Sequence, residues 1–223
     1  MNPSRSDTTP LSVPDGMGKS CWSCRGLVAG VPFCPTCQAI QPPDMAVDFF
    51  QLFGLPVAFS LEMAALEASY QALQRQFHPD RFATRSTTER RLSLEHVTRI
   101  NQAYQTLRDP LARSSYLLTR MGHQPVAAEG QDPEFLLEVM EQREALAEVD
   151  LASTEAIEAL ARLRAGVERH IEQELQRLTR LFVSATPEEM SEIARINHRL
   201  QYHRRFLEAL DQAEETIYLG GML

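Results

Sequence analysis

Apolar residues recur every three or four positions over most of the chain after residue 43, which is the spacing of one face of an α-helix. No convincing run of alternating apolar and polar residues indicates a strand in this part of the sequence. The pattern therefore predicts an all-α body, preceded by a segment without helical periodicity.

Four helices are expected in the first half of this body, and proline and glycine mark their ends. A short one covers about 47–53. A second has Ser60 as its N-cap and must end before Pro79, because proline has no backbone N–H and disfavours helix at the preceding residue. The third ends at Asp109–Pro110, and the fourth ends at Gly122. The second and third helices have apolar stripes that can face each other in an antiparallel hairpin.

Three more helices are expected in the second half. Asp132–Pro133 has the form of a helix start, and Ser153 is a weaker N-cap for a helix that reaches about Val183. Thr186, followed three residues later by Glu189, forms a capping box at the start of the last helix. Three long helices with short connections indicate an antiparallel bundle.

These patterns divide the chain into five parts. We expect a flexible tail (1–20), a cysteine-containing module with its linker (21–43), a first helical domain (44–122), a polar connector (123–131) and a three-helix domain (132–223).

Charge and hydropathy narrow the possible partners. The chain has a net charge of -8, and residues 123–223 contain twenty acidic and ten basic side chains. Such a surface repels phosphate backbones, so we expect protein partners and no nucleic acid. The mean hydropathy of -0.28 and the lack of a long apolar run predict a soluble protein with no membrane partner.

All four cysteines lie in the N-terminal module, as Cys21, Cys24, Cys34 and Cys37 in a C-x2-C-x9-C-x2-C array. Two Cys-x-x-Cys knuckles supply the four thiolates that tetrahedral zinc requires, so structural zinc is expected, and no organic cofactor. A small iron–sulfur or rubredoxin-like iron site is the alternative. No ligand position remains open, which favours a structural role or a surface for a partner or a second copy. We expect residues 21–43 to be ordered only with metal, and the helices to be independent of it.

The N-terminal sequence indicates the compartment. Arg5 and Lys19 are opposed by Asp7 and Asp15, and no apolar segment follows, so secretion is not expected. Paired cysteines in a reducing compartment more often bind metal than form disulfides. We therefore expect the bacterial cytoplasm, with the mitochondrial matrix as the alternative.

The tripeptide His78–Pro79–Asp80 lies at the expected tip of the helical hairpin. Together with the flanking 73–77 and 81–82, and with 100–107 and 109–116, it resembles the J-domain. The resemblance implies a protein that is not an enzyme, but docks onto a DnaK-type chaperone and stimulates that partner's ATPase. Arg75 and Arg81 flank the tripeptide and suit an acidic partner surface. The alternatives are an ordinary proline turn, or a catalytic His78–Asp80 pair, which lacks a neighbouring nucleophile.

The rest of the body resembles the HscB family of iron–sulfur cluster co-chaperones. The resemblance rests on 49–56, on 116–118, and on 135–138 with 143–146, whereas the Gly/Phe-rich linker and repeated cysteine units of general DnaJ proteins are missing. It implies that the C-terminal bundle binds an IscU-type iron–sulfur scaffold protein and that the J-domain delivers the scaffold to an HscA/DnaK-type ATPase chaperone. The scaffold-binding residues carried over are Leu136, Leu137, Met140, Glu141, Glu144 and Phe206. The apolar members could instead be bundle core, and the two glutamates ordinary surface.

Tetracysteine modules similar to this one occur in eukaryotic HscB relatives, whereas many bacterial members begin directly at the J-domain. A rival hypothesis is a J-domain adaptor whose zinc ribbon binds nucleic acid or another protein. Arg25 is the only basic residue in 21–43, too little for a phosphate-binding surface. A homodimer is also possible, and an enzyme would show turnover without a partner.

Overall fold

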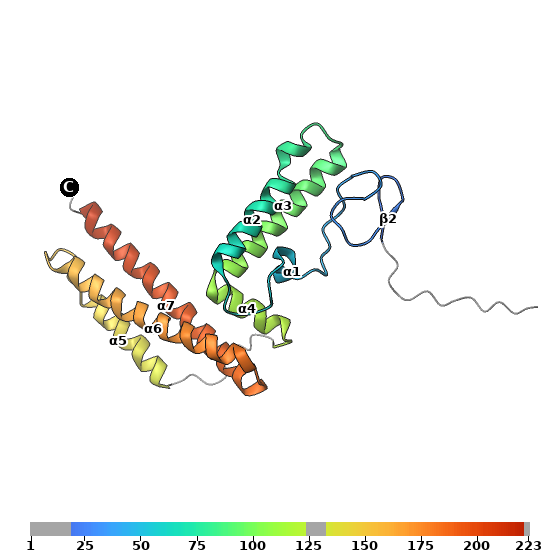
Figure 1. Cartoon of the computed structure of the whole chain (residues 1–223). Helices are drawn as coiled ribbons and strands as arrows, with labels where there is room; N and C mark the ends of the chain where they lie inside the picture. The colour runs from blue at the N-terminus through green and yellow to red at the C-terminus, as the bar shows by residue number, and fades with distance from the viewer. Residues whose placement is uncertain (1–18, 124–132, 221–223) are drawn as a thin grey trace, which may run out of the picture. The chain divides into compact units, whose positions relative to one another are not determined.

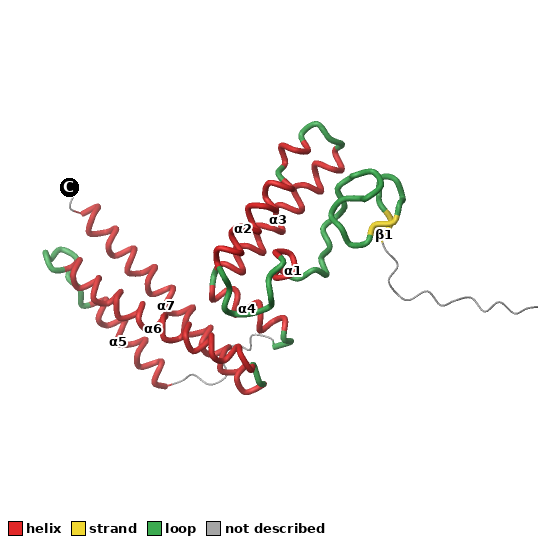
Figure 2. Tube along the Cα trace, in the orientation of Figure 1, coloured by secondary structure: helices red, strands yellow, loops and turns green. Residues whose placement is uncertain are grey.

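The computed structural model describes residues 19–123 and 133–220. Helices dominate these residues (Figures 1 and 2). The chain divides into two compact units, one of 1–48 with 70–101 and one of 49–69 with 102–223, and each is described separately. The helices are α1 (Phe49–Phe53), α2 (Met63–Phe77), the 3-10 helix η1 (Pro79–Phe82), α3 (Thr87–Arg108), α4 (Pro110–Arg120), α5 (Pro133–Ala147), α6 (Ala156–Ser184) and α7 (Pro187–Gly220).

The prediction of an all-α body is confirmed, and the strands of the described residues lie in the cysteine module and in the two residues just before it. There, β1 (Lys19–Ser20) pairs with β2 (Leu27–Val28) in an antiparallel sheet of two strands (Figure 2). The predicted tail and connector lie outside the described residues, except for residues 19, 20 and 123. Asp132, the expected start of α5, also lies outside them.

In the first unit, the inner face of α3 forms the core. Leu92, His96 and Ile100 are at most 6% exposed, as their helical spacing predicts. A capping box that the sequence analysis did not identify starts α3. Ser86 Oγ accepts a hydrogen bond from the N–H of Glu89 (3.3 Å), and the Glu89 carboxylate accepts one from the N–H of Ser86 (3.2 Å).

In the second unit, α1 packs on α4. The N–H of Phe49 donates to Tyr116 Oη at 3.0 Å, and the two rings stack with centroids 4.6 Å apart. Asp109 caps α4 by accepting hydrogen bonds from the N–H groups of Leu111 (2.8 Å) and Ala112 (3.1 Å), with Pro110 at the first helical position.

The start of α2 differs from the prediction, because α2 begins at Met63 and Ser60 lies before it. The nearby ring of Phe59 explains this difference. That ring is 6% exposed, stacks on Phe182 at 5.0 Å and lies 5.1 Å from the guanidinium of Arg113. Because Phe59 is buried against these two side chains, the residues from 59 to 62 stay outside the helix, and α2 begins only at Met63.

The C-terminal helices α5, α6 and α7 form the predicted three-helix bundle (Figure 1). Leu160 and Val167 of α6 pack with Phe206 and Leu210 of α7 in its core. The capping box at Thr186 is confirmed: Thr186 Oγ1 accepts from the N–H of Glu189 at 3.3 Å, and Glu189 accepts from the N–H of Thr186 at 2.6 Å.

Two details at the ends of α6 follow local chemistry. Ser153 does not cap α6, which begins at Ala156; its hydroxyl accepts from the N–H of Glu155 in the turn just before the helix. At the other end, Ala185 adopts a left-handed conformation with φ 46°, which turns the chain into α7.

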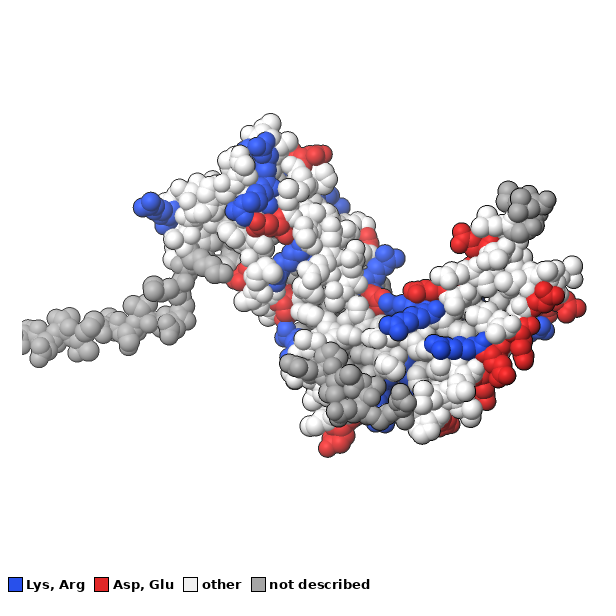
Figure 3. Space-filling view, turned by 180° about the vertical axis from the view of Figure 1, so that it is seen from behind, with Lys and Arg blue, Asp and Glu red and all other residues white. Residues whose placement is uncertain are grey.

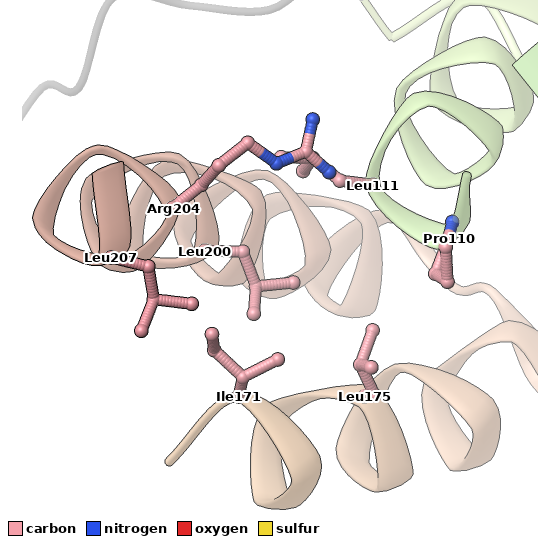
Figure 4. A pocket seen from close by; sticks show the side chains of 7 residues that line it. All are labelled: Pro110, Leu111, Ile171, Leu175, Leu200, Arg204 and Leu207. Carbon is pink, nitrogen blue, oxygen red and sulfur yellow. The ribbon is translucent and has the colours of Figure 1, made fainter. Parts of the chain in front are cut away.

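The helix α4 is joined to the bundle within the second unit. Asp109 and Arg204 form an ion pair at 2.6 Å, and Asn197 Nδ2 donates to Ser115 Oγ at 3.5 Å. Beside this ion pair lies a mainly apolar pocket of about 180 Å³ (Figure 4). Its lining comes from α4, α6 and α7: Pro110, Leu111, Ile171, Leu175, Leu200, Arg204 and Leu207. The packing between α4 and the helices α6 and α7 therefore leaves a small cavity.

Across residues 19–123 and 133–220, no helix combines the length and the apolar character that crossing a membrane requires.

Candidate metal centre and docking surfaces

Two loops of the same geometry hold the four cysteines. The N–H of Cys21 donates to the carbonyl of Gly26 at 2.8 Å, and the N–H of Cys34 donates to the carbonyl of Ala39 at 2.9 Å. In each loop a second hydrogen bond at 2.9 Å closes the turn: the N–H of Arg25 donates to the carbonyl of Cys21, and the N–H of Gln38 donates to the carbonyl of Cys34. Both donor residues have a left-handed backbone, Arg25 with φ 62° and Gln38 with φ 60°. Each Cys-x-x-Cys pair is therefore carried by a closed turn that presents both thiols on one side.

The sulfur atoms converge as the array predicts. Cys21 Sγ lies 3.7 Å from Cys37 Sγ, Cys24 Sγ lies 3.6 Å from Cys34 Sγ, and all four lie within 4.8 Å of one another. A tetrahedral zinc ion with Zn–S bonds of about 2.3 Å separates its sulfurs by about 3.8 Å. The four free thiols therefore fit one metal ion.

The electrostatics of the cluster favour a thiolate at Cys21 but oppose one at Cys24. Burial opposes ionisation of Cys21, but the backbone N–H groups of Cys24 and Ser23 and the neighbouring thiols lower its pKa to about 6. The N–H of Gly26 acts to lower the pKa of Cys24, but the Cys37 sulfur, burial and the other two sulfurs together raise it to about 12. A thiolate at Cys24 is thus disfavoured beside the other sulfurs, and a bound metal ion would supply the positive charge that offsets this effect.

The cysteine module packs against the helical hairpin through Gln41 and Phe33. Gln41 was assigned to a linker, yet it is 6% exposed. Its side-chain N–H donates to Cys21 Sγ at 3.3 Å, and its carbonyl accepts from His96 Nε2–H at 2.8 Å. Phe33 stacks on Phe77 at 5.5 Å, and Phe77 stacks on His96 at 4.1 Å. The module therefore contacts this end of the hairpin, and the expectation that the helices keep their structure without metal stays a prediction.

The His78–Pro79–Asp80 loop follows Phe77 directly. Pro79 starts η1, and His78 Nδ1 accepts a hydrogen bond from the N–H of Asp80 at 3.3 Å. The side chains of His78 and Asp80 are 53% and 90% exposed and lie 3.6 Å apart. Beneath them, Phe77 and Phe82 are buried. The loop is therefore a fixed turn that presents an imidazole and a carboxylate to solvent.

Arginines surround this loop. Arg75 and Arg81 are both exposed, and Arg81 Nη1 donates to the carbonyl of Arg75 at 3.2 Å. Figure 3 shows arginine side chains gathered at the free end of the α2–α3 hairpin, and acidic side chains along the C-terminal helices. A shallow groove of about 300 Å³ lies beside the loop, lined by Phe33, Gln38, Gln76, Arg81, Phe82, Arg85 and Glu89. The cysteine module thus contributes Phe33 and Gln38 to the surface next to the loop.

The outer face of α5 is apolar and exposed. Leu136, Leu137 and Met140 are 38%, 58% and 67% exposed, and Glu141 and Glu144 beside them are also exposed. These three apolar residues are therefore not bundle core. The neighbouring Phe135 is 7% exposed, and Leu146 further along α5 packs against the core of the bundle.

Phe206, the sixth residue of the expected scaffold-binding set, lies elsewhere. It is 5% exposed and packs with Leu160, Val167 and Leu210. The structure therefore brings five of the six residues together on the surface of α5 and places Phe206 in the core.

The residues that join the module to the hairpin were not predicted from the sequence. Phe33, next to Cys34, is one of the few large apolar residues in the module. That position was a usable signal, because an aromatic residue in so small a module has little core of its own to fill. No local pattern marks the pairing of Gln41 with His96, which lie 55 residues apart.

A helical hairpin that presents an exposed His–Pro–Asp turn, followed by a three-helix bundle, defines a J-domain co-chaperone. The comparisons with known proteins agree. A family model described as the HSCB C-terminal oligomerisation domain matches residues 131–211. A co-chaperone protein HscB homolog of Burkholderia multivorans is 40% identical over 149 residues, which are 66% of this chain and 83% of the relative.

Solved structures show the same relationship. The crystal structure of the human co-chaperone protein HscB is 32% identical, with a TM-score of 0.78, covering 88% of this chain and 98% of that chain. The chaperone HscB from Vibrio cholerae is 34% identical, with a TM-score of 0.67, covering 76% of this chain and 99% of that chain. The chain belongs to the HscB family of co-chaperones and is not an enzyme.

Proposed function

We propose that this protein delivers an IscU-type iron–sulfur scaffold protein to an HscA/DnaK-type ATPase chaperone. In this proposal residues 44–122 are the J-domain, which stimulates the chaperone's ATPase, and residues 132–223 are the scaffold-binding domain. The observation that carries it is the large exposed apolar face of α5, made by Leu137 and Met140 beside two carboxylates, on a chain that also presents the His–Pro–Asp turn. An exposed apolar surface rimmed by charge is typical of a protein interface.

The chaperone interaction rests on the loop and the arginines beside it. His78, Pro79 and Asp80 form a fixed, exposed turn, and Arg75 and Arg81 add positive charge that suits an acidic partner surface. Replacement of His78 with Gln should abolish the stimulation of a DnaK-type ATPase while leaving helicity and scaffold binding unchanged. Replacement of the exposed Arg162, on α6, with Gln is the matched surface control. Full stimulation by the His78→Gln variant would exclude this role for the loop.

The scaffold interaction rests on α5. Leu136, Leu137 and Met140 supply the apolar contact, and Glu141 and Glu144 lie at its rim, where charges mainly steer association. We assign Phe206 an indirect role in scaffold binding, because it packs in the core of the bundle and stabilises α6 and α7. Calorimetry with a purified IscU-type protein tests the proposal, and no binding by the parent protein would remove the scaffold role and leave the J-domain role standing.

We propose that the tetracysteine centre holds structural zinc through Cys21, Cys24, Cys34 and Cys37. When bound, the ion supplies positive charge that stabilises the four thiolates. Gln41, which donates to Cys21 Sγ, then links this centre to α3. Elemental analysis of the protein purified under reducing conditions distinguishes zinc from iron.

Two further points follow from this role. We propose a reducing compartment, where paired cysteines bind metal more often than they form disulfides: the bacterial cytoplasm, with the mitochondrial matrix as the alternative. A homodimer is proposed on the description of the matching family model, and light scattering tests it.

A gel shift at low salt tests the rival nucleic-acid role, which has little support because Arg25 is the only basic residue in 21–43.

A further inference from the structure

Three side chains that can bind metal meet in the C-terminal bundle, one from each helix: Glu138 of α5, His170 of α6 and His203 of α7. The carboxylate Oε1 of Glu138 lies 2.6 Å from His170 Nδ1 and 4.0 Å from His203 Nε2. One donor atom of each residue lies within 4.8 Å of the other two. A single ion between them could therefore contact all three.

Two buried polar atoms of this cluster have no hydrogen-bond partner. One is Nδ1 of His203, a residue that is 2% exposed, and the other is Oε1 of Gln142. Gln142 belongs to the cluster because its Nε2 donates to Glu138 Oε1 at 3.0 Å. Roughly 90% or more of buried polar groups in proteins are paired, so these two atoms leave hydrogen-bonding capacity unused in and beside the cluster, while His203 Nε2 is the nitrogen that lies nearest Glu138.

The surrounding charges suit a cation. The charged or titratable groups that act on His203 are Glu138, His170, Glu174 and Arg199. Arg199 and Glu174 form an ion pair at 3.0 Å and compensate each other, which leaves the carboxylate of Glu138. Burial lowers the pKa of His203, so its ring is neutral at pH 7 and keeps a lone pair for a ligand bond.

We propose that Glu138, His170 and His203 bind a divalent transition-metal ion, separate from the tetracysteine centre, that joins α5 to α6 and α7. Two imidazoles and one carboxylate suit Zn²⁺ or Co²⁺, whereas Ca²⁺ and Mg²⁺ prefer ligand sets made of oxygen. The side chains of His170 and Glu138 are 46% and 33% exposed, so an ion can enter from solvent and keep a water ligand.

The structural effect concerns α5. Among its other contacts with α7 are the Phe135 ring, edge-on to Tyr202 at 5.6 Å, and a hydrogen bond from Tyr202 Oη to the carbonyl of Val139 at 3.2 Å. A metal bond through Glu138 adds a link at the centre of the helix. The ion would hold α5, and with it Leu137 and Met140, in one position on the bundle.

The test uses the full chain with its tetracysteine centre already filled by one equivalent of Zn²⁺. Co²⁺ is then titrated and followed by calorimetry and by visible absorption. Binding by nitrogen and oxygen gives visible bands without the near-ultraviolet band of a sulfur–cobalt bond, which separates this site from the cysteines. We expect one further equivalent per chain, and slower hydrogen exchange in α5 when it is bound.

Two variants decide whether these residues are the ligands. His170→Asn should lower the Co²⁺ affinity at least about tenfold and remove the effect on exchange in α5. His198→Asn is the matched control, because His198 is an exposed histidine of α7 outside the cluster, and it should bind as the parent does. No further equivalent in the parent, or unchanged affinity in both His170→Asn and Glu138→Gln, would overturn the proposal and leave an ordinary Glu138–His170 ion pair.

Discussion

The ring of Phe33 stacks on the ring of Phe77 with their centroids 5.5 Å apart and their planes 9° apart. Phe33 precedes Cys34 of the cysteine module, and Phe77 precedes His78 of the His78–Pro79–Asp80 loop. The other face of this contact is completed by His96, whose ring stacks on Phe77 and whose Nε2–H donates to Gln41. The cysteine module and the His78–Pro79–Asp80 loop are therefore joined by one small cluster of stacked rings.

Removal of the metal should disorder the module and leave most of the helices folded. The helices have their own core, including Leu66, Ile100 and Leu107, whereas the module has little beyond its cysteines. Trp22 is the only tryptophan, and its Nε1–H donates to the carbonyl of Ile40 at 2.7 Å. Chelation should shift its fluorescence to longer wavelength with little change in far-ultraviolet circular dichroism. A large loss of helicity would contradict this expectation.

Phe33→Ala should weaken chaperone stimulation without loss of the metal. The substitution removes the ring that supports Phe77, so the turn at His78 becomes less fixed, while the four cysteines are untouched. We expect the half-maximal concentration for ATPase stimulation to rise a few-fold. Val31→Ala, at an exposed position of the same module, is the control. Equal stimulation by parent and Phe33→Ala, with zinc content unchanged, would show that the stack does not matter to docking.

Substitutions on the two sides of the bundle should separate stability from scaffold binding. Phe206→Ala leaves a cavity in the core and should lower the free energy of unfolding by about 3–5 kcal/mol. Leu137→Ala with Met140→Ala should change it by less than about 0.5 kcal/mol per site, because both side chains are exposed. The same pair should weaken scaffold binding roughly thirty-fold, which corresponds to about 2 kcal/mol. Urea unfolding and calorimetry measure the two effects, and a stably folded double variant with parental affinity would place the binding site elsewhere.

Acid should destabilise the bundle through His203. Burial lowers the pKa of His203 from 6.5 in the folded protein, although Glu138 opposes the shift. Below pH 6.5 His203 takes up a proton in the unfolded chain but stays neutral in the folded protein until the pH reaches its lower folded pKa. The free energy of unfolding therefore falls as the pH drops from 6.5 towards the folded pKa. Urea midpoints at pH 7.5 and 5.5, without added metal, should differ less in His203→Gln than in the parent. An equal difference in both would mean that other groups cause the pH dependence.

Much of the fold could be predicted because local chemistry decides it. Pro79 ends α2 and Pro110 begins α4, because proline restricts the backbone at its own position and at the residue before it. Thr186 and Glu189 cap α7 through contacts between residues only three positions apart. The start of α2 could not be predicted in this way. It depends on Phe59 packing against Phe182, and a pattern within the sequence does not reveal such a distant partner.

The candidate site was predictable to a similar extent. The cysteine spacing and the His–Pro–Asp tripeptide identified their positions because each function needs its residues close together in sequence. The sequence did not decide which apolar residues of α5 and α7 point outward. Both helices have apolar residues on more than one face, so the pattern alone does not separate buried from exposed positions. The cluster of Glu138, His170 and His203 left no trace in the sequence, since its members come from three helices.

The left-handed turn at Ala185 has a consequence for the order of folding. Only Ala185 and Thr186 separate the 29-residue helix α6 from the 34-residue helix α7, so their pairing closes a very short loop. Contacts with small sequence separation form fastest, which makes the α6–α7 hairpin the expected nucleus of the bundle, with α5 docking later. Substitutions such as Leu178→Ala near that turn should slow folding, whereas substitutions in α5 should mainly speed unfolding.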